Sequence, residues 1–147
     1  MQIKNYLSAL LFLLSAFIIA APFSSVYAAN KKIKEIDAKE LKSWIDSGKD
    51  FKLVDARPKK YEEGSLIVGA KFLPYNADEE AITEALPSKD AVVVAYCASS
   101  ECPASTYLAK HLIKMGYKNV YKYTDGIDDW TEKGYPTTEV KASKDSK

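Results

Sequence analysis

The sequence predicts an α/β fold in which a central parallel sheet is covered by helices on both faces. Segments with strand patterns alternate with segments of helical periodicity, an order typical of parallel sheets. Residues 91–96 form a continuous apolar run rich in β-branched side chains, which favours a strand buried on both faces. The chain has 147 residues, of which 47% are hydrophobic. It is long enough for one such domain and too short for two ordinary ones.

The segment before this central strand contains two predicted helices and two predicted strands. Residues 37–40 are a capping box, Asp-Ala-Lys-Glu, which begins a helix that ends at Gly48. Residues 51–56 and 70–73 are short apolar stretches flanked by turn residues, and we predict strands there. The glycine-punctuated stretch between them is predicted to be irregular. Residues 79–86 are predicted to form a short helix that ends before a proline.

The segment after the central strand continues the alternation. A helix is predicted within residues 105–115, because apolar side chains recur on one face and Gly116 follows. Residues 120–123 are a predicted strand and residues 127–133 a predicted short helix. The polar tail, residues 141–147, is predicted to be disordered.

Residues 1–28 have the features of a secretory signal peptide. Lys4 gives a positive start, residues 6–21 are apolar and uncharged, and small residues precede a cleavage site after Ala28. This apolar run is shorter than the ~18 residues that usually span a bilayer, so we expect cleavage and no stable membrane anchor. The mature chain is then one domain, residues 29–140. We predict an exported, periplasmic protein whose cysteines meet an oxidising compartment.

Composition excludes several function classes. Lys and Arg total 21 against 20 Asp and Glu, so no basic excess points to nucleic acid. With one histidine and two cysteines, the chain cannot build a multi-histidine or all-cysteine metal site. A zinc site of Cys97, Cys102 and His111 is a minor alternative, because His111 is better explained as a surface residue of a helix. We therefore predict no resident metal and no cofactor.

Cys97 lies where the central predicted strand ends and a loop leads into the next helix. Such a loop points backbone N–H groups inward and places the positive end of the helix dipole there. A thiol held in that environment ionises more readily, and the thiolate is the nucleophile. The alternative is a buried, inert thiol. The candidate N–H donors belong to Ala98, Ser99, Ser100, Glu101 and Cys102.

Cys102 is the second candidate residue of this loop. It precedes Pro103, a residue type favoured in the first turn of a helix, so we expect Cys102 at the N-cap. Three interpretations stay open. Cys102 is a resolving thiol for an oxidised or persulfidated Cys97, half of a static disulfide that contributes about 2 kcal/mol, or an unpaired loop residue.

Asp55 and Arg57 are secondary site candidates at the end of an earlier strand. Both side chains could approach the loop, but a structural ion pair or a loop anchor is the favoured interpretation.

Several short motifs occur between residues 36 and 136 in a specific order and spacing. They are Leu53–Arg57, Tyr61–Ala70, Tyr96-Cys97, Leu112, Gly116-Tyr117, Val120, Asp125–Ile127 with Trp130, and Gly134–Pro136. Together they resemble the rhodanese-like (sulfurtransferase) domain family.

This resemblance implies an enzyme, with Cys97 as its nucleophile. Cys97 would take sulfane sulfur from a donor such as thiosulfate or polysulfide, and the loop N–H groups would stabilise the persulfide. A thiol acceptor, such as a thioredoxin-like protein, would then remove the sulfur. Two alternatives stay open: a periplasmic thiol redox protein that uses Cys97 and Cys102, and a non-catalytic rhodanese-like binding module.

The sequence departs from the family pattern in two places. Ser105 follows Cys97 by eight positions, two more than is usual, and the loop carries Glu101 but no Arg or Lys. We expect thiosulfate to be a poor substrate, and the missing Arg argues against the related phosphatases and arsenate reductases. Leu66 and Val68 stand where His and Pro are usual, and we interpret both as structural changes.

Overall fold

The computed structural model describes residues 33–141. The predicted signal peptide, residues 1–28, lies outside the described residues, as does the predicted tail apart from residue 141. Among the described helices, none has the length and apolar character needed to cross a bilayer.

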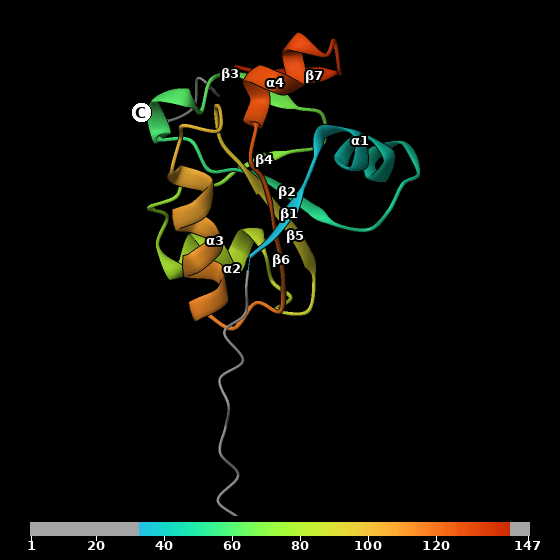
Figure 1. The fold of residues 1–147 in the computed structure, drawn as a ribbon. Coiled ribbons are helices and arrows are strands. Elements are labelled where there is room, and N and C mark those ends of the chain that lie inside the picture. Colours follow the sequence, from blue (N-terminus) through green and yellow to red (C-terminus); the bar gives the residue numbers. More distant parts are fainter. Residues whose placement is uncertain (1–32, 142–147) are drawn as a thin grey trace, which may run out of the picture.

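A five-stranded sheet forms the centre of the fold, and every strand pairing in it is parallel. The strand order is β1-β6-β5-β2-β4, which places β5 in the middle (Figure 1). This arrangement confirms the predicted parallel sheet and its buried central strand. The strands are β1 (Lys34–Ile36), β2 (Lys52–Asp55), β4 (Lys71–Phe72), β5 (Val92–Tyr96) and β6 (Asn119–Tyr123).

Helices cover both faces of this sheet, as predicted. Buried side chains of α2 and α3 pack with one face, and those of α1 and α4 pack with the other. Figure 1 shows α2 and α3 together on one side and α1 on the opposite side. The capping box is present, since the Asp37 side chain accepts the Glu40 N–H at 2.7 Å. The helices are α1 (Ala38–Asp46), α2 (Glu79–Ala85), α3 (Ala104–Lys114) and α4 (Gly126–Glu132), with a 3₁₀ turn η1 (Lys59–Tyr61).

A second, two-stranded sheet corrects the prediction of an irregular stretch after residue 56. Strand β3 (Gly64–Ile67) pairs antiparallel with β7 (Thr137–Val140). Figure 1 shows this pair beside α4, beyond the ends of the central strands. These two strands, and also β1, were not predicted from the sequence, because each is short and pairs with a strand far away in the chain. Local apolar patterning does not reveal such pairings.

A buried carboxylate ties the small sheet to the central one. Asp55, at the end of β2, accepts hydrogen bonds from the Arg57 backbone N–H and from its guanidinium Nε, both at 2.9 Å, and forms a salt bridge with Nη2 at 2.7 Å. Arg57 Nη2 also donates to the Ser65 carbonyl of β3 at 2.7 Å. The expected ion pair is therefore present, and it anchors β3. Because Asp55 is fully buried, this pairing offsets the cost of removing its charge from water.

Tyr96 completes the same network from β5. Its hydroxyl accepts the Ile67 backbone N–H at 3.1 Å and lies near the Asp55 carboxylate. Burial, followed by the nearby Asp55 charge, raises the pKa of Tyr96 far above its ordinary value. The phenol therefore stays protonated across the physiological pH range.

We expect Tyr96→Phe to lower the free energy of unfolding by about 1–3 kcal/mol, because the buried Ile67 N–H loses its acceptor. Urea denaturation followed by circular dichroism measures this loss. Tyr107→Phe is the matched control, since Tyr107 is 53% exposed and its substitution is expected to change stability by less than about 0.5 kcal/mol. Equal stability of the two variants would contradict a structural role for the Tyr96 hydroxyl.

Candidate functional site

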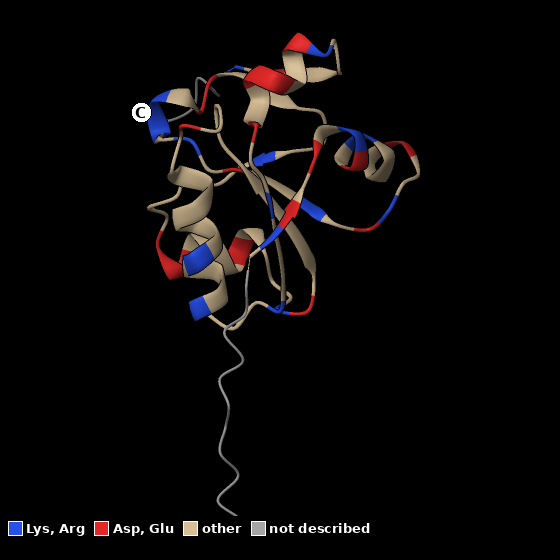
Figure 2. Ribbon diagram, viewed as in Figure 1, with Lys and Arg blue, Asp and Glu red and all other residues tan. Residues whose placement is uncertain are grey.

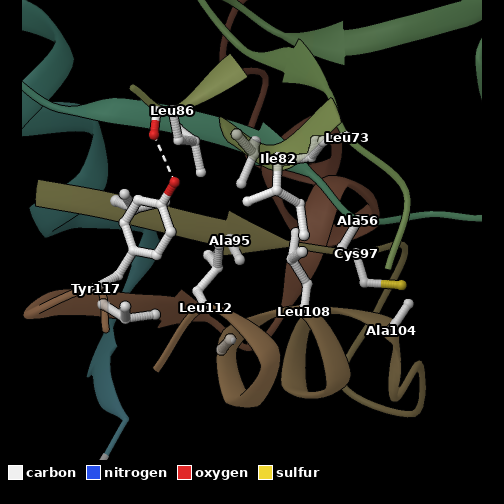
Figure 3. Close-up of a cluster of buried hydrophobic side chains, with 14 residues drawn as sticks. Ala56, Leu73, Ile82, Leu86, Ala95, Cys97, Ala104, Leu108, Leu112 and Tyr117 are labelled. Atoms are coloured by element: carbon white, nitrogen blue, oxygen red, sulfur yellow. Dashed lines mark hydrogen bonds between the residues drawn. The ribbon is translucent and has the colours of Figure 1, made fainter. Parts of the chain in front are cut away.

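Cys97 is the residue directly after β5, at the carboxyl edge of the central sheet. Its side chain is fully buried in the cluster that α2 and α3 cover. Figure 3 shows Cys97 at the tip of the β5 arrow, with its sulfur at the end of the cluster, near Ala104. Figure 3 also shows Ala56 on the other side of Cys97. The sulfur thus lies between the end of the sheet and the beginning of α3.

The loop that follows bends back onto Cys97. The Cys102 N–H donates to the Ser99 carbonyl at 3.0 Å, which closes a turn. This turn brings the Cα atoms of Cys97 and Cys102 to 6.1 Å, and the two sulfurs form a disulfide. In the structure Cys102 is therefore paired.

The predicted N-cap position of Cys102 is wrong by one residue. The N-cap of α3 is Pro103, whose carbonyl accepts the Tyr107 N–H at 3.0 Å. Pro103 already has helical dihedral angles, with φ −81° and ψ −7°. Proline needs no partner for an N–H group, so it can precede the first turn. Cys102 lies just outside the helix, where its side chain is free to turn toward Cys97.

The first turn of α4 holds the beginning of the loop. The Ile127 N–H donates to the Cys97 carbonyl and the Asp128 N–H to the Ala98 carbonyl, both at 3.0 Å. In a trans peptide the C=O and N–H groups point in opposite directions. The N–H groups of Ala98 and Ser99 therefore point away from α4.

Four loop N–H groups have no acceptor within residues 33–141. They belong to Ala98, Ser99, Ser100 and Glu101. Of the five predicted donors, Cys102 alone is engaged, through its bond to Ser99. Unused backbone donors next to a sulfur can stabilise a thiolate or another anion. The loop geometry therefore equips the site to stabilise a negative charge on or near the Cys97 sulfur.

Gly126 makes the α4 contact possible. A Cβ atom at this position would lie 2.6 Å from the Cys97 carbonyl oxygen and 2.5 Å from that of Ala98. The backbone also has a φ of +73°, which side chains disfavour. The sequence analysis noted this glycine as part of a family pattern and did not identify its role against the loop.

Thr124 is a second feature that the sequence analysis missed. Its hydroxyl is buried and has no hydrogen-bond partner in the part of the chain that the structure describes. In the sheet register Tyr123 of β6 is opposite Tyr96 of β5. Thr124 and Cys97, the residues that directly follow them, therefore lie side by side at the carboxyl edge of the sheet. No local sequence signal marks this threonine, because its environment depends on strand pairing.

The loop offers backbone donors but no cationic side chain. Glu101 is exposed, and the Arg57 guanidinium is engaged with Asp55 and Ser65. Figure 2 shows that basic and acidic residues are interspersed over the described fold. Within residues 33–141, no group of three or more His, Cys, Asp or Glu residues is placed to hold a metal ion, and His111 lies in the middle of α3.

The sequence profile of the rhodanese-like domain matches residues 37–133. The chain belongs to this family. No curated protein matches the sequence. The model resembles the BH2092 protein of Bacillus halodurans, with a TM-score of 0.66 and 26% identity over 72% of this chain and 77% of that one.

Two further solved structures share the rhodanese-like fold. The rhodanese-like domain of the Anabaena Alr3790 protein has a TM-score of 0.63 and 23% identity over 79% of this chain and 91% of that one. A thiosulfate sulfurtransferase from Pseudomonas aeruginosa has a TM-score of 0.60 and 19% identity over 75% of this chain and 21% of that one. At these identities the likeness concerns the fold alone.

The structure accounts for two departures of this rhodanese-like domain from the family pattern, Leu66 in β3 and Val68 directly after it. Leu66 is buried, at 3% exposure, where an imidazole would need hydrogen-bond partners. The Val68 N–H donates to the Pro136 carbonyl at 3.2 Å, a bond that a proline at position 68 could not make. Both substitutions thus support the β3–β7 sheet, in agreement with the structural interpretation.

We expect Gly126→Ala to cost more than about 2 kcal/mol of unfolding free energy, since it adds a clash with the loop to the strain of a positive φ. Gly134→Ala is a control at the other end of α4. Gly134 has a φ of +68°, and an added Cβ meets nothing within 4 Å, so we expect a loss of about 1 kcal/mol. Chemical denaturation of both variants measures the difference. Equal losses would show that Gly126 is needed only for its backbone conformation.

Proposed function

We propose that this rhodanese-like domain is a sulfurtransferase that carries sulfane sulfur as a persulfide on Cys97. The supporting observation is the set of four unused N–H donors in the loop that begins at Cys97. A structural neighbour is a thiosulfate sulfurtransferase, although this chain spans only 21% of that protein. The catalytic residue is Cys97, and Ala98 to Cys102 form the persulfide-binding loop.

The reaction begins from the reduced loop, because the Cys97 sulfur is bonded to Cys102 in the structure. The Cys97 thiolate attacks the outer sulfur of the donor. With thiosulfate, the sulfur–sulfur bond of the donor breaks and sulfite leaves with the bonding electron pair. The new persulfide anion accepts hydrogen bonds from the loop N–H groups. An acceptor thiolate then takes the outer sulfur, and the Cys97 thiolate leaves.

No general base is needed for this sequence of steps. The nucleophile and the leaving group are both the Cys97 thiolate, and backbone donors stabilise it. We propose that the protein is exported to the periplasm, on the basis of the signal peptide predicted from the sequence. Its partners would be a small sulfur donor and a thiol acceptor, the latter a small thiol or a thioredoxin-like protein, and not a nucleic acid.

The disulfide favours a second candidate function. A domain that cycles between the Cys97–Cys102 disulfide and two thiols could exchange electrons with other thiol proteins without handling sulfane sulfur. The two functions differ in one product: only a sulfurtransferase gains the mass of a sulfur atom from its donor.

We expect the reduced Cys102→Ser variant, which cannot close the loop disulfide, to gain the mass of one sulfur atom when it is mixed with polysulfide or thiosulfate, and the Cys97→Ser variant to gain none. Intact-mass spectrometry under non-reducing conditions measures the gain. The Cys97→Ser variant keeps Cys102, so it also controls for unspecific loading of a thiol. Loading of Cys97→Ser at the level of Cys102→Ser would place the nucleophile elsewhere. An unloaded Cys102→Ser variant would favour the redox function.

We expect Glu101→Gln to raise kcat/KM for thiosulfate by ~3-fold to 10-fold at low ionic strength, because it removes a negative charge from the anion-binding loop. Sulfite release measures the rate, and added salt should reduce the gain. Asp50→Asn is the control. It removes the same charge from a fully exposed side chain that precedes β2, at the amino edge of the sheet. Equal effects of the two substitutions would refute local repulsion by Glu101.

A further inference from the structure

The two sulfurs of the disulfide differ in their surroundings. Cys97 is fully buried at the end of the apolar cluster, whereas Cys102 is only partly buried and lies between the exposed residues Glu101 and Pro103. The backbone on each side is also fixed independently. The α4 N–H groups hold Cys97, and the turn from Ser99 holds Cys102. In the closed disulfide, the loop therefore joins a partly accessible sulfur to a buried one.

We propose that Cys102 reduces the Cys97 persulfide and releases its outer sulfur as hydrosulfide. This inference rests on the proposed sulfurtransferase function. The Cys102 thiolate attacks the inner sulfur, which is the Cys97 Sγ. The bond between the inner and outer sulfurs breaks, and the outer sulfur leaves with the electron pair as hydrosulfide. The Cys97–Cys102 disulfide forms at the same time, so the outer sulfur is reduced and Cys102 is oxidised.

The structure corresponds to the product of this step. A bond between the Cys97 and Cys102 sulfurs is compatible with the β5 end, the turn and the start of α3 all in place. The attack therefore needs no rearrangement of the sheet or the helices. Because Cys102 belongs to the same short loop, it competes with an external acceptor as an intramolecular nucleophile of high effective concentration.

Reopening the loop requires two thiol equivalents, which one dithiol reductant supplies. One thiolate of the dithiol attacks the accessible Cys102 sulfur, and the Cys97 thiolate leaves toward the unused loop N–H groups. The second thiol of the reductant then displaces Cys102, and the reductant leaves as its own disulfide. One cycle thus consumes a sulfane sulfur donor and a dithiol, and it produces hydrosulfide.

A single turnover without reductant tests the proposal. The protein is reduced, freed of reductant and mixed with excess thiosulfate, a donor that contains no sulfide. Sulfite and sulfide are both quantified, and the final protein is weighed by intact-mass spectrometry. We expect the wild-type protein to release one sulfite and one sulfide per chain and to end as the disulfide, two hydrogen atoms lighter than the reduced protein.

Cys102→Ser separates this proposal from the function on which it rests. We expect the variant to release one sulfite and no sulfide, and to keep the mass of one sulfur atom. Cys102→Ala serves as a second variant if the serine destabilises the loop. Sulfite without sulfide from the wild-type protein would overturn the role of Cys102 and leave the sulfurtransferase function intact. Absence of sulfite from the wild-type protein and both variants would overturn both.

A mapping experiment tests the point of attack by the reductant. The oxidised wild-type protein is mixed with glutathione, remaining thiols are blocked with N-ethylmaleimide, and the mixed disulfide is located by peptide mass mapping. We expect glutathione on Cys102 and the maleimide on Cys97. Glutathione predominantly on Cys97 would overturn Cys102 as the accessible sulfur.

Discussion

The contact between the first turn of α4 and the carbonyls of Cys97 and Ala98 is the constraint on which the site depends. It joins the loops that follow two neighbouring parallel strands, β5 and β6, at one edge of the sheet. Because the two carbonyls are engaged, the N–H groups of the next peptide units face away from α4. Gly126 permits the close approach. The orientation of the loop donors is thus set by packing of the backbone and does not need a charged side chain.

The same edge of the sheet contains a buried polar network around Asp55. Asp55 and Tyr96 end the two central strands, and Arg57 and Ile67 link them to β3. Burial of a carboxylate is unfavourable unless its oxygens are paired, so the network specifies where the small sheet docks. Pro136, the residue directly before β7, in turn accepts the Trp130 indole N–H with its carbonyl, and this bond fixes α4. The position of α4, and with it that of the Cys97 loop, therefore depends indirectly on the buried Asp55 carboxylate.

Much of the fold could be predicted from the sequence because it depends on local patterns. The capping box at Asp37 and the apolar run of β5 are each signals contained within a few residues. They predicted helix α1 and strand β5, and the structure confirms both. Strands β3 and β7 could not be predicted, since their stability comes from pairing with each other across the chain. The position of Cys97 at a strand end was predictable for the same local reason. Its contact with α4 and the disulfide to Cys102 required the tertiary structure.

The departures of the loop from the family pattern have a common physical basis. Eight positions separate Cys97 from Ser105, which leaves room for the turn that closes at Cys102. The same loop carries Glu101 and no cation, so it holds an anionic donor less strongly than a basic loop would. A thiol that resolves the persulfide from within also has less need to bind a second anionic ligand. In the proposed mechanism, a longer loop that lacks cations and has its own second cysteine is better suited to forming and discharging a persulfide than to retaining the donor.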